Sequence, residues 1–161
     1  MLTTFIEPRT TMPIFLIRSL RRTACLTLLA LSLPLTAAYA QQTLPVKKFA
    51  AGVYLIQAEM ASTEAQRELG LMNRKELGTN DGMMFIFDRP YAYCMWMKNT
   101  LLPLSVAFLD SDGVILNVEE MLPQTETNHC AVKPALYALE MNAGWFKHKN
   151  IKPGTKITMM K

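Results

Sequence analysis

The chain has 161 residues, of which 50% are hydrophobic, and a formal net charge of +4 at pH 7. This length suits a single domain. Most of the excess charge lies in the first 40 residues, since the rest of the chain has 13 Lys and Arg against 12 Asp and Glu, a net charge of +1. No basic run remains there that would indicate nucleic-acid binding, so no nucleic-acid partner is expected.

The first 40 residues have the pattern of a secretory signal peptide. Three arginines within residues 18–22 precede an apolar run over residues 24–35, and Ala38-Tyr39-Ala40 places small residues where a signal peptidase reads them. A membrane anchor is the alternative, but the run is shorter than the roughly 20 residues that a spanning helix needs. The pattern predicts cleavage after Ala40 and a periplasmic or secreted protein with no transmembrane segment. Met12 is the favoured start, because an acidic residue and a proline precede it.

The mature chain is expected to begin with a flexible lead-in over residues 41–51, followed by one globular domain over residues 52–161. Thr63 and Gln66 form a capping-box pattern that begins a short helix, and a second short helix is expected around Trp145. Apolar runs bounded by turn residues predict short strands at 53–58, 83–87, 94–97, 104–109, 114–118, 135–141 and 155–159. Because strands outnumber helices and do not alternate with them, the fold is predicted to be α+β. Its sheet is predicted to be mostly antiparallel and curled, or a small β-barrel, with two short helices.

Cysteine content changes when the leader is removed. Cys25 leaves with the leader, and Cys94 and Cys130 remain. Two cysteines in an exported protein predict one disulfide. In the chain-entropy model such a bridge would stabilise the fold by roughly 3–4 kcal/mol. Two separate buried thiols are the alternative.

The segment from Cys94 to Thr100 changes abruptly from apolar to polar and is the principal candidate site. Residues 94–97 are predicted to form a core strand, and Lys98, Asn99 and Thr100 follow it with a cation, an amide and a hydroxyl. A strand that ends in such side chains brings them to one rim of a sheet, where ligand sites are common. The alternative is a structural turn in which Asn99 and Thr100 bond the local backbone.

One of two charged residues, Arg74 or Glu140, is expected within contact range of that rim. Arg74 follows the first helix, and Glu140 is the only charged residue of its predicted strand. The structural interpretation of Glu140 is a helix cap or an ion pair with an arginine such as Arg67. A catalytic carboxylate acting with Lys98 is the alternative, but one glutamate without an identified partner does not define acid–base chemistry.

Methionines provide a further alternative. Met95 and Met97 would project from one face of their strand, and together with His129 or Cys130 their thioethers could bind Cu(I). Methionine more commonly fills irregular gaps in a small core. The prediction is therefore that no metal site and no cofactor is present.

Several short motifs in this order resemble the domain-of-unknown-function family 192, a group of small prokaryotic domains of which many are exported. The resemblance covers about Val53 to the C-terminus, and two positions depart from the usual pattern: Met95 stands where an aromatic residue is usual, and Ser105 where an acidic residue is usual. The resemblance implies a compact β-rich fold with helices, and it implies no established activity or catalytic residue. Its carriers are Gln66-Arg67, Gly70-Leu71-Met72, Arg74, Gly82-Met83-Met84-Phe85, Trp96-Met97-Lys98-Asn99-Thr100, Pro103-Leu104, Asp110 with Gly113, and Glu140 with Gly144.

Three functions remain open from the sequence, which does not decide whether the protein is an enzyme. The first is a periplasmic binding or accessory module for a small molecule or a cell-envelope component. The second is a hydrolase that acts on the cell envelope through Lys98 and Glu140. The third is a periplasmic copper-binding protein that uses Met95 and Met97. The candidate ligand-binding residues are Arg74, Lys98, Asn99, Thr100 and Glu140.

Overall fold

The computed structural model describes residues 43–161, so the predicted signal peptide lies outside the described residues. Most of the regular structure is β-strand, and no helix in the described range is long and apolar enough to cross a membrane. The elements in chain order are β1 (Val46–Ala51), β2 (Tyr54–Ala61), α1 (Glu64–Leu69), β3 (Asp81–Tyr91), β4 (Cys94–Met95), β5 (Leu104–Leu109), β6 (Ile115–Met121), β7 (His129–Cys130), β8 (Ala135–Asn142), α2 (Trp145–His148) and β9 (Ile157–Met159).

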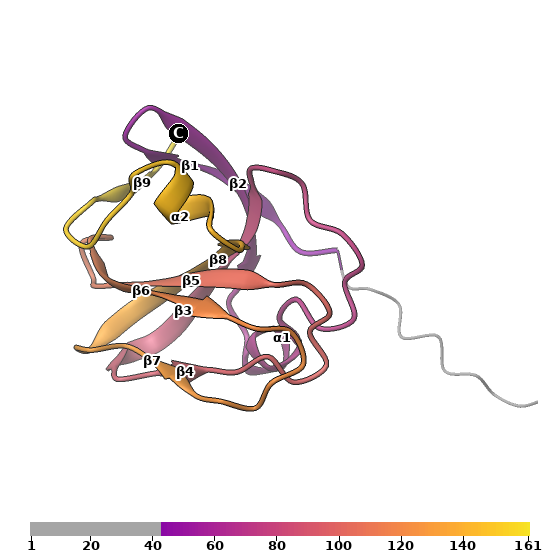
Figure 1. Cartoon of the computed structure of the whole chain (residues 1–161). Coiled ribbons are helices and arrows are strands. Elements are labelled where there is room, and N and C mark those ends of the chain that lie inside the picture. The colour runs from indigo at the N-terminus through magenta and orange to yellow at the C-terminus, as the bar shows by residue number, and fades with distance from the viewer. Residues whose placement is uncertain (1–42) are drawn as a thin grey trace, which may run out of the picture. The chain divides into compact units, whose positions relative to one another are not determined.

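Seven strands form one curled sheet in the order β6-β5-β8-β3-β2-β1-β9, which makes a half-barrel (Figure 1). Neighbouring strands are antiparallel except for β2 and β3, which are parallel and are joined through α1. A parallel pair needs such a crossover, because the chain must return to the starting edge before the second strand begins. The predicted fold, a mostly antiparallel curled sheet with two short helices, is confirmed.

Each face of the sheet has its own apolar cluster, because successive side chains of a strand point to opposite faces. Met84 and Leu139 belong to the cluster that includes α2, and Met83 and Phe85 belong to the other. Figure 1 shows α2 on the inside of the curl and α1 with β4 and β7 over the other face. The sheet is therefore covered on both faces along its centre, where β3, β5 and β8 lie.

The prediction of a flexible lead-in over residues 41–51 is wrong from Val46 onward. β1 pairs with both β2 and β9, and Phe49 and Ala51 are buried in the core. The polar start of this segment hid the strand, since Lys47 and Lys48 are exposed while the apolar residues that follow them pack inward. Pairing on both sides supplies backbone hydrogen bonds that its composition does not indicate.

The prediction of a core strand over residues 94–97 is also wrong. β4 has only two residues and pairs with β7 in a separate two-stranded sheet. Of the residues that follow, Met97 is fully buried, whereas Trp96 is 45% exposed. The segment thus covers one face of the half-barrel. A short apolar run is compatible both with a strand inside the sheet and with a segment packed on the sheet, so the sequence pattern did not distinguish them.

The predicted disulfide between Cys94 and Cys130 is confirmed. The two residues face each other across β4 and β7, with their Cα atoms 3.9 Å apart. Asn117 of β6 holds this ribbon to the main sheet: its amide nitrogen donates to the carbonyl of Cys130 at 3.0 Å, and its amide oxygen accepts from the backbone of Val132 at 3.2 Å. The disulfide therefore joins the two strands of the cover to each other, and the buried amide of Asn117 fastens them to the main sheet.

Ser105 of β5, which stands where the family usually has an acidic residue, is fully buried and lies beside the start of α2. Its hydroxyl donates to Glu120 at 2.7 Å and accepts from the backbone N–H of Gly144 at 2.8 Å. Glu120 also accepts from that N–H, at 3.1 Å. A carboxylate is therefore still present at the start of α2, supplied by β6 instead of β5.

Candidate functional site

A cavity of about 300 Å³ lies between the sheet and its cover of α1 and the segment around β4. Its size is at the lower end of the range for small-molecule sites. The walls come from elements far apart in the sequence, and the lining residues are Glu64, Arg67, Glu68, Leu69, Gly70, Leu71, Met72, Phe85, Phe87, Tyr93, Cys94, Met95, Trp96, Thr100 and Glu140.

Helix α1 begins and ends through local interactions that place its residues at the cavity. The hydroxyl of Thr63 accepts from the backbone of Gln66 at 3.3 Å, and the Gln66 side chain accepts from the backbone of Thr63 at 3.0 Å, so the predicted capping box is confirmed. Gly70 ends the helix with a φ of +47°. A Cβ at Gly70 would lie 3.3 Å from the ring of Phe85, so glycine permits this close approach of the helix to the sheet.

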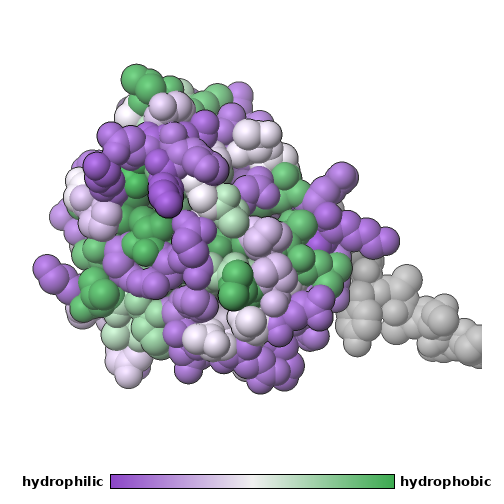
Figure 2. All heavy atoms as spheres, in the orientation of Figure 1, coloured by the Kyte–Doolittle hydropathy of each residue, from purple (hydrophilic) through white to green (hydrophobic). Residues whose placement is uncertain are grey.

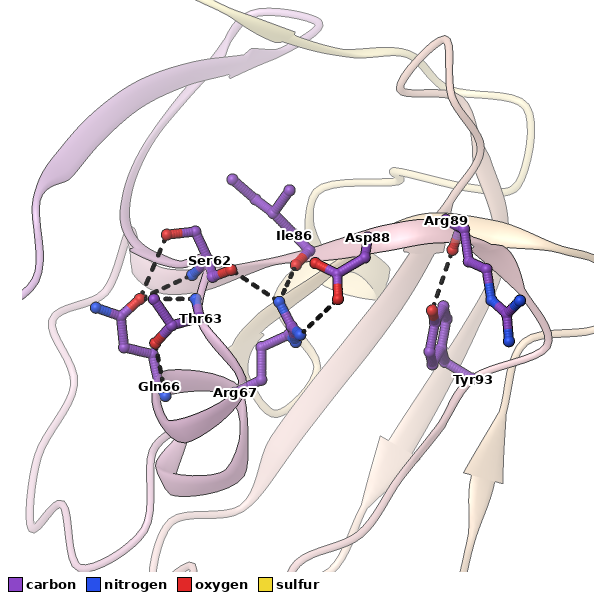
Figure 3. Close-up of polar contacts among 8 residues, drawn as sticks. All are labelled: Ser62, Thr63, Gln66, Arg67, Ile86, Asp88, Arg89 and Tyr93. Carbon is purple, nitrogen blue, oxygen red and sulfur yellow. Dashed lines mark hydrogen bonds and ion pairs between the residues drawn. The ribbon is translucent and has the colours of Figure 1, made fainter.

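Arg67 fastens α1 to the edge of β3 (Figure 3). Its Nη1 donates to the carbonyls of Ser62 and Ile86, both at 2.8 Å, and its Nη2 lies 3.3 Å from Asp88. The Asp88 side chain is 82% exposed, so this ion pair is solvated and contributes little. The hydrogen bonds to the two carbonyls therefore anchor α1 to β3. They also use guanidinium donors that would otherwise be available to a ligand.

Aromatic side chains form much of the cavity wall. The rings of Phe87 and Tyr93 are stacked, with centroids 3.7 Å apart, and the Tyr93 hydroxyl donates to the carbonyl of Arg89 at 3.1 Å (Figure 3). Phe85 forms part of the floor, and Trp96 stands at the exposed side. Phe85, Phe87 and Tyr93 give the site rigid apolar walls, since each is held by packing or by a hydrogen bond.

Glu140 is the unusual residue of the cavity. It lies in β8 between β3 and β5, opposite the buried apolar residues Met83 and Val106, and is only 4% exposed. Within residues 43–161 its carboxyl group has no hydrogen bond and no ion pair. Every fully buried polar side-chain atom in that part of the chain has a hydrogen-bond partner. The carboxyl oxygens of Glu140 have none, so they are not fully buried and remain accessible from the cavity.

Burial raises the pKa of Glu140 from 4.5 to about 8, because the apolar surroundings disfavour the charged form. Glu140 is therefore mostly a neutral carboxylic acid at pH 7. The expected structural roles of Glu140, a helix cap or an ion pair with an arginine, are not what the structure shows in the described chain. Arg67 pairs with Asp88 instead, and Arg74 with Glu59.

Of the residues predicted at the rim, the structure brings only Thr100 to the cavity of Glu140. Thr100 is buried, and its hydroxyl donates to the carbonyl of Lys98 at 3.3 Å. Asn99 is exposed with a φ of +55°, and its carbonyl accepts from the backbone of Asn73 at 2.9 Å. Lys98 is exposed, and its Nζ lies 5.1 Å from the ring centroid of Trp96. Lys98 and Asn99 thus belong to a turn outside the cavity.

Arg74 lies in a different place, a larger groove of about 770 Å³ over β2 and the loop before β3. Its Nη2 is 2.6 Å from a carboxylate oxygen of Glu59, and both side chains are mostly buried. Size alone favours this groove as a site. The smaller cavity is nevertheless the better candidate, because Glu140 is a buried polar group that faces it without a partner, whereas Arg74 and Glu59 of the groove are paired with each other.

A copper site at the methionines has limited support in the geometry. Met97 is fully buried in the core, while Met95 lines the cavity. No group of three or more His, Cys, Asp or Glu side chains that could hold a metal ion occurs in the described part of the chain.

The aromatic residues Phe85, Phe87 and Tyr93 line the cavity but were not predicted as site residues. Aromatic residues in apolar runs look like ordinary core residues.

Fold and cavity together define a small, mostly β, single-domain protein with a buried carboxyl group in an aromatic pocket. The chain belongs to the domain-of-unknown-function family 192, whose sequence profile, described as "Uncharacterized ACR", matches residues 25–159. No curated protein matches the chain.

Two solved structures are similar to the whole described domain. One is described as a candidate transcription regulator from Sinorhizobium meliloti; it is 32% identical with a TM-score of 0.72, and the match covers 74% of this chain and 97% of the other. The second is a protein of unknown function from Novosphingobium aromaticivorans, 33% identical with a TM-score of 0.70, and the match covers 74% of this chain and 89% of the other. The family is thereby established.

Proposed function

We propose that the protein is a small-ligand-binding domain that holds its ligand in the cavity around Glu140. The observation that supports this proposal is the unpaired carboxyl group of Glu140 at the wall of an otherwise mostly apolar cavity. Burying a polar group without a hydrogen bond costs roughly 1–3 kcal/mol. A ligand that bonds to this group would recover that cost, so the site is arranged to gain more from a ligand than an apolar pocket would.

The proposal keeps the binding module predicted from the sequence but moves its site from the rim to the cavity. Thr100 and Glu140 remain from the predicted set, and Lys98 and Asn99 contribute only the turn beside the cavity. A hydrolase that uses Lys98 with Glu140 is less well supported, because Lys98 does not line the cavity that Glu140 faces. With the predicted signal peptide, the ligand would be met in the periplasm or outside the cell.

The description of one relative as a candidate transcription regulator has little support in this chain. Beyond residue 40 the net charge is only +1. DNA-binding domains usually carry a concentrated excess of Lys and Arg that neutralises phosphates. We therefore favour a small ligand over nucleic acid.

A fragment screen followed by two-dimensional ¹H–¹⁵N NMR of the purified protein tests the proposal. Fragments that bind should shift the amides of α1, of β3 at Phe85 and of the segment around Trp96. Leu69→Trp places a large ring at the cavity rim and should abolish these shifts. Leu122→Trp is the matched control, because Leu122 is 70% exposed and does not line the cavity. Fragment shifts that map to the groove of Arg74, or that survive Leu69→Trp, would contradict the proposal.

A further inference from the structure

We infer that the cavity accepts an organic cation, an ammonium group on a small apolar or aromatic body, and that the ammonium group binds at Glu140. This inference rests on the proposed function, since it names the chemical class of ligand for the same cavity. Three observations carry it: the charges of the lining, the aromatic walls, and the unpaired carboxyl group.

The charged residues of the cavity favour a positive ligand. Glu64 and Glu68 are exposed on α1 at its entrance, and Glu140 lies inside. Arg67 is the single cationic residue among those that line the described cavity, and its guanidinium already bonds two carbonyls and Asp88. An anion would therefore meet an acidic entrance and a single cationic side chain whose Nη1 donors are already bonded to carbonyls, whereas a cation is attracted by the carboxyl groups at the entrance and inside.

The aromatic walls add a second source of attraction. The faces of Phe, Tyr and Trp rings attract cations through their quadrupoles, and rings grouped around a pocket recognise ammonium ligands. Four such rings line this cavity, from Phe85, Phe87, Tyr93 and Trp96. The protein already shows this interaction, since the ammonium group of Lys98 lies 5.1 Å from the Trp96 ring centroid.

Glu140 determines where the cation would bind. Glu140 is only 4% exposed and has no ion pair in the described chain, so an ammonium group in the cavity would be its first ion-pair partner. Because the pKa of Glu140 is about 8, Glu140 must lose its proton to pair with a cation at pH 7. This deprotonation lowers the binding constant of the cation about tenfold. A charge-assisted hydrogen bond in low-dielectric surroundings more than offsets this reduction. Binding should therefore release the proton of Glu140.

A metal ion is a poorer occupant than an organic cation. Divalent ions need several oxygen, nitrogen or sulfur ligands, and Glu140 is the one carboxylate in the interior of the cavity. No group of three His, Cys, Asp or Glu side chains that could hold a metal ion occurs in residues 43–161. Aromatic rings contribute nothing to such coordination. They do contact the carbon atoms and the diffuse charge of an organic ammonium ion.

Three probes that share one aromatic ring test the inference: benzylammonium, benzyl alcohol and benzoate. NMR titration of the purified protein at pH 7 should show benzylammonium binding at least tenfold more tightly than benzyl alcohol, with benzoate the weakest. Calorimetry in buffers of different ionisation enthalpy should show close to one proton released for each benzylammonium bound. For benzyltrimethylammonium, whose charge does not titrate, affinity should rise about tenfold between pH 7 and pH 9 as Glu140 ionises.

The other titratable residues around the cavity bear on this pH dependence. They are Glu64, Arg67 and Glu68 of α1 and Tyr93 of the covering segment, whereas the lining residues from β3 do not titrate. Glu140→Gln should remove the proton release and the preference for a cation over benzyl alcohol. Glu126→Gln is the matched control, because it makes the same change at an exposed carboxylate outside the cavity.

The outcomes separate this inference from the proposed function. If benzyl alcohol or benzoate binds as tightly as benzylammonium and is lost in Leu69→Trp, the cavity binds ligands but the cation inference is wrong. If none of the probes binds in the cavity, both the inference and the proposed function are contradicted. Should Glu140→Gln fail to fold, the absence of proton release from the wild-type protein would still overturn the inference.

Discussion

At the residue scale, Glu140 links the stability of the fold to its candidate function. Its neighbours across the sheet, Met83 and Val106, are fully apolar, so its charge would have no compensation inside the protein. The protein tolerates this residue because the proton stays on, as the raised pKa indicates. A leucine at this position would pack with less cost, so the carboxyl group is better explained by binding than by stability.

The raised pKa of Glu140 predicts a pH-dependent stability. The folded state holds the proton up to about pH 8, whereas the unfolded state releases it near pH 4.5. The stabilisation of the folded state by this bound proton is therefore fully present below pH 4.5 and is lost as the pH rises to about 8. The free energy of unfolding falls by roughly 5 kcal/mol at most over this range. Glu140→Gln should abolish this decline and be the more stable protein at pH 9. Urea unfolding at pH 5, 7 and 9 measures the effect.

The control for this prediction is Glu126→Gln, which removes an exposed carboxylate and should keep the wild-type pH dependence. At pH 5 the wild-type protein and Glu140→Gln should agree within about 1 kcal/mol, because a neutral carboxyl group and an amide have similar size and polarity. Parallel pH profiles of wild-type protein and Glu140→Gln would show that Glu140 is not protonated in the folded state.

At the scale of elements, the short ribbon of β4 and β7 matters more than its length indicates. It forms one wall of the cavity through Cys94 and Met95, and the side chain of Asn117 fastens it to β6. Two isolated strands are not stable in water by themselves. The Cys94–Cys130 bond therefore maintains both the ribbon and the shape of the site.

Removing this disulfide should weaken the fold. The bond joins residues that are 36 positions apart, so the double variant Cys94→Ala, Cys130→Ala should lose roughly 3–4 kcal/mol of unfolding free energy in the chain-entropy model. Thermal and urea unfolding measure this loss, and ligand binding should weaken with it because the cavity wall loosens. Reductant should destabilise the wild-type protein similarly and leave the double variant unchanged. A wild-type melting temperature that ignores reductant would contradict the prediction.

At the scale of the whole molecule, the predicted leader and the disulfide point to the same compartment. Disulfides form and persist in the periplasm and outside the cell, and a signal peptide would direct the chain there. The expected cleavage point after Ala40 precedes β1, the first strand in the part of the chain that the structure describes. We therefore propose that the folded domain works as an exported protein.

Expression of the full chain in a Gram-negative host tests this proposal. The periplasmic fraction should contain a protein that begins at Gln41, as shown by N-terminal sequencing and intact mass. Ala40→Arg should block cleavage, because the peptidase site requires a small residue there. Recovery of an uncleaved chain from the cytoplasm alone would contradict export.

The sequence by itself determined the features that depend on neighbours in the chain. The strand over Leu104–Leu109 was predicted with its observed bounds, because a run with five apolar residues out of six between turn residues leaves little choice. The capping box of Thr63 and Gln66 was predicted because its geometry is set within a single helical turn. The fold class followed from the number and spacing of such strands.

Only the tertiary structure decided which of these elements meet. Residues 94–97 are as apolar as a core strand, but whether such a run pairs in the sheet or covers it depends on the strands that already occupy the sheet positions. Glu140 was recognised as a lone charge in a strand, yet its lack of a partner follows from Arg67 and Arg74 being bonded elsewhere. Hydrophobic periodicity is local, whereas the burial of a charge and the shape of a cavity depend on packing between distant segments.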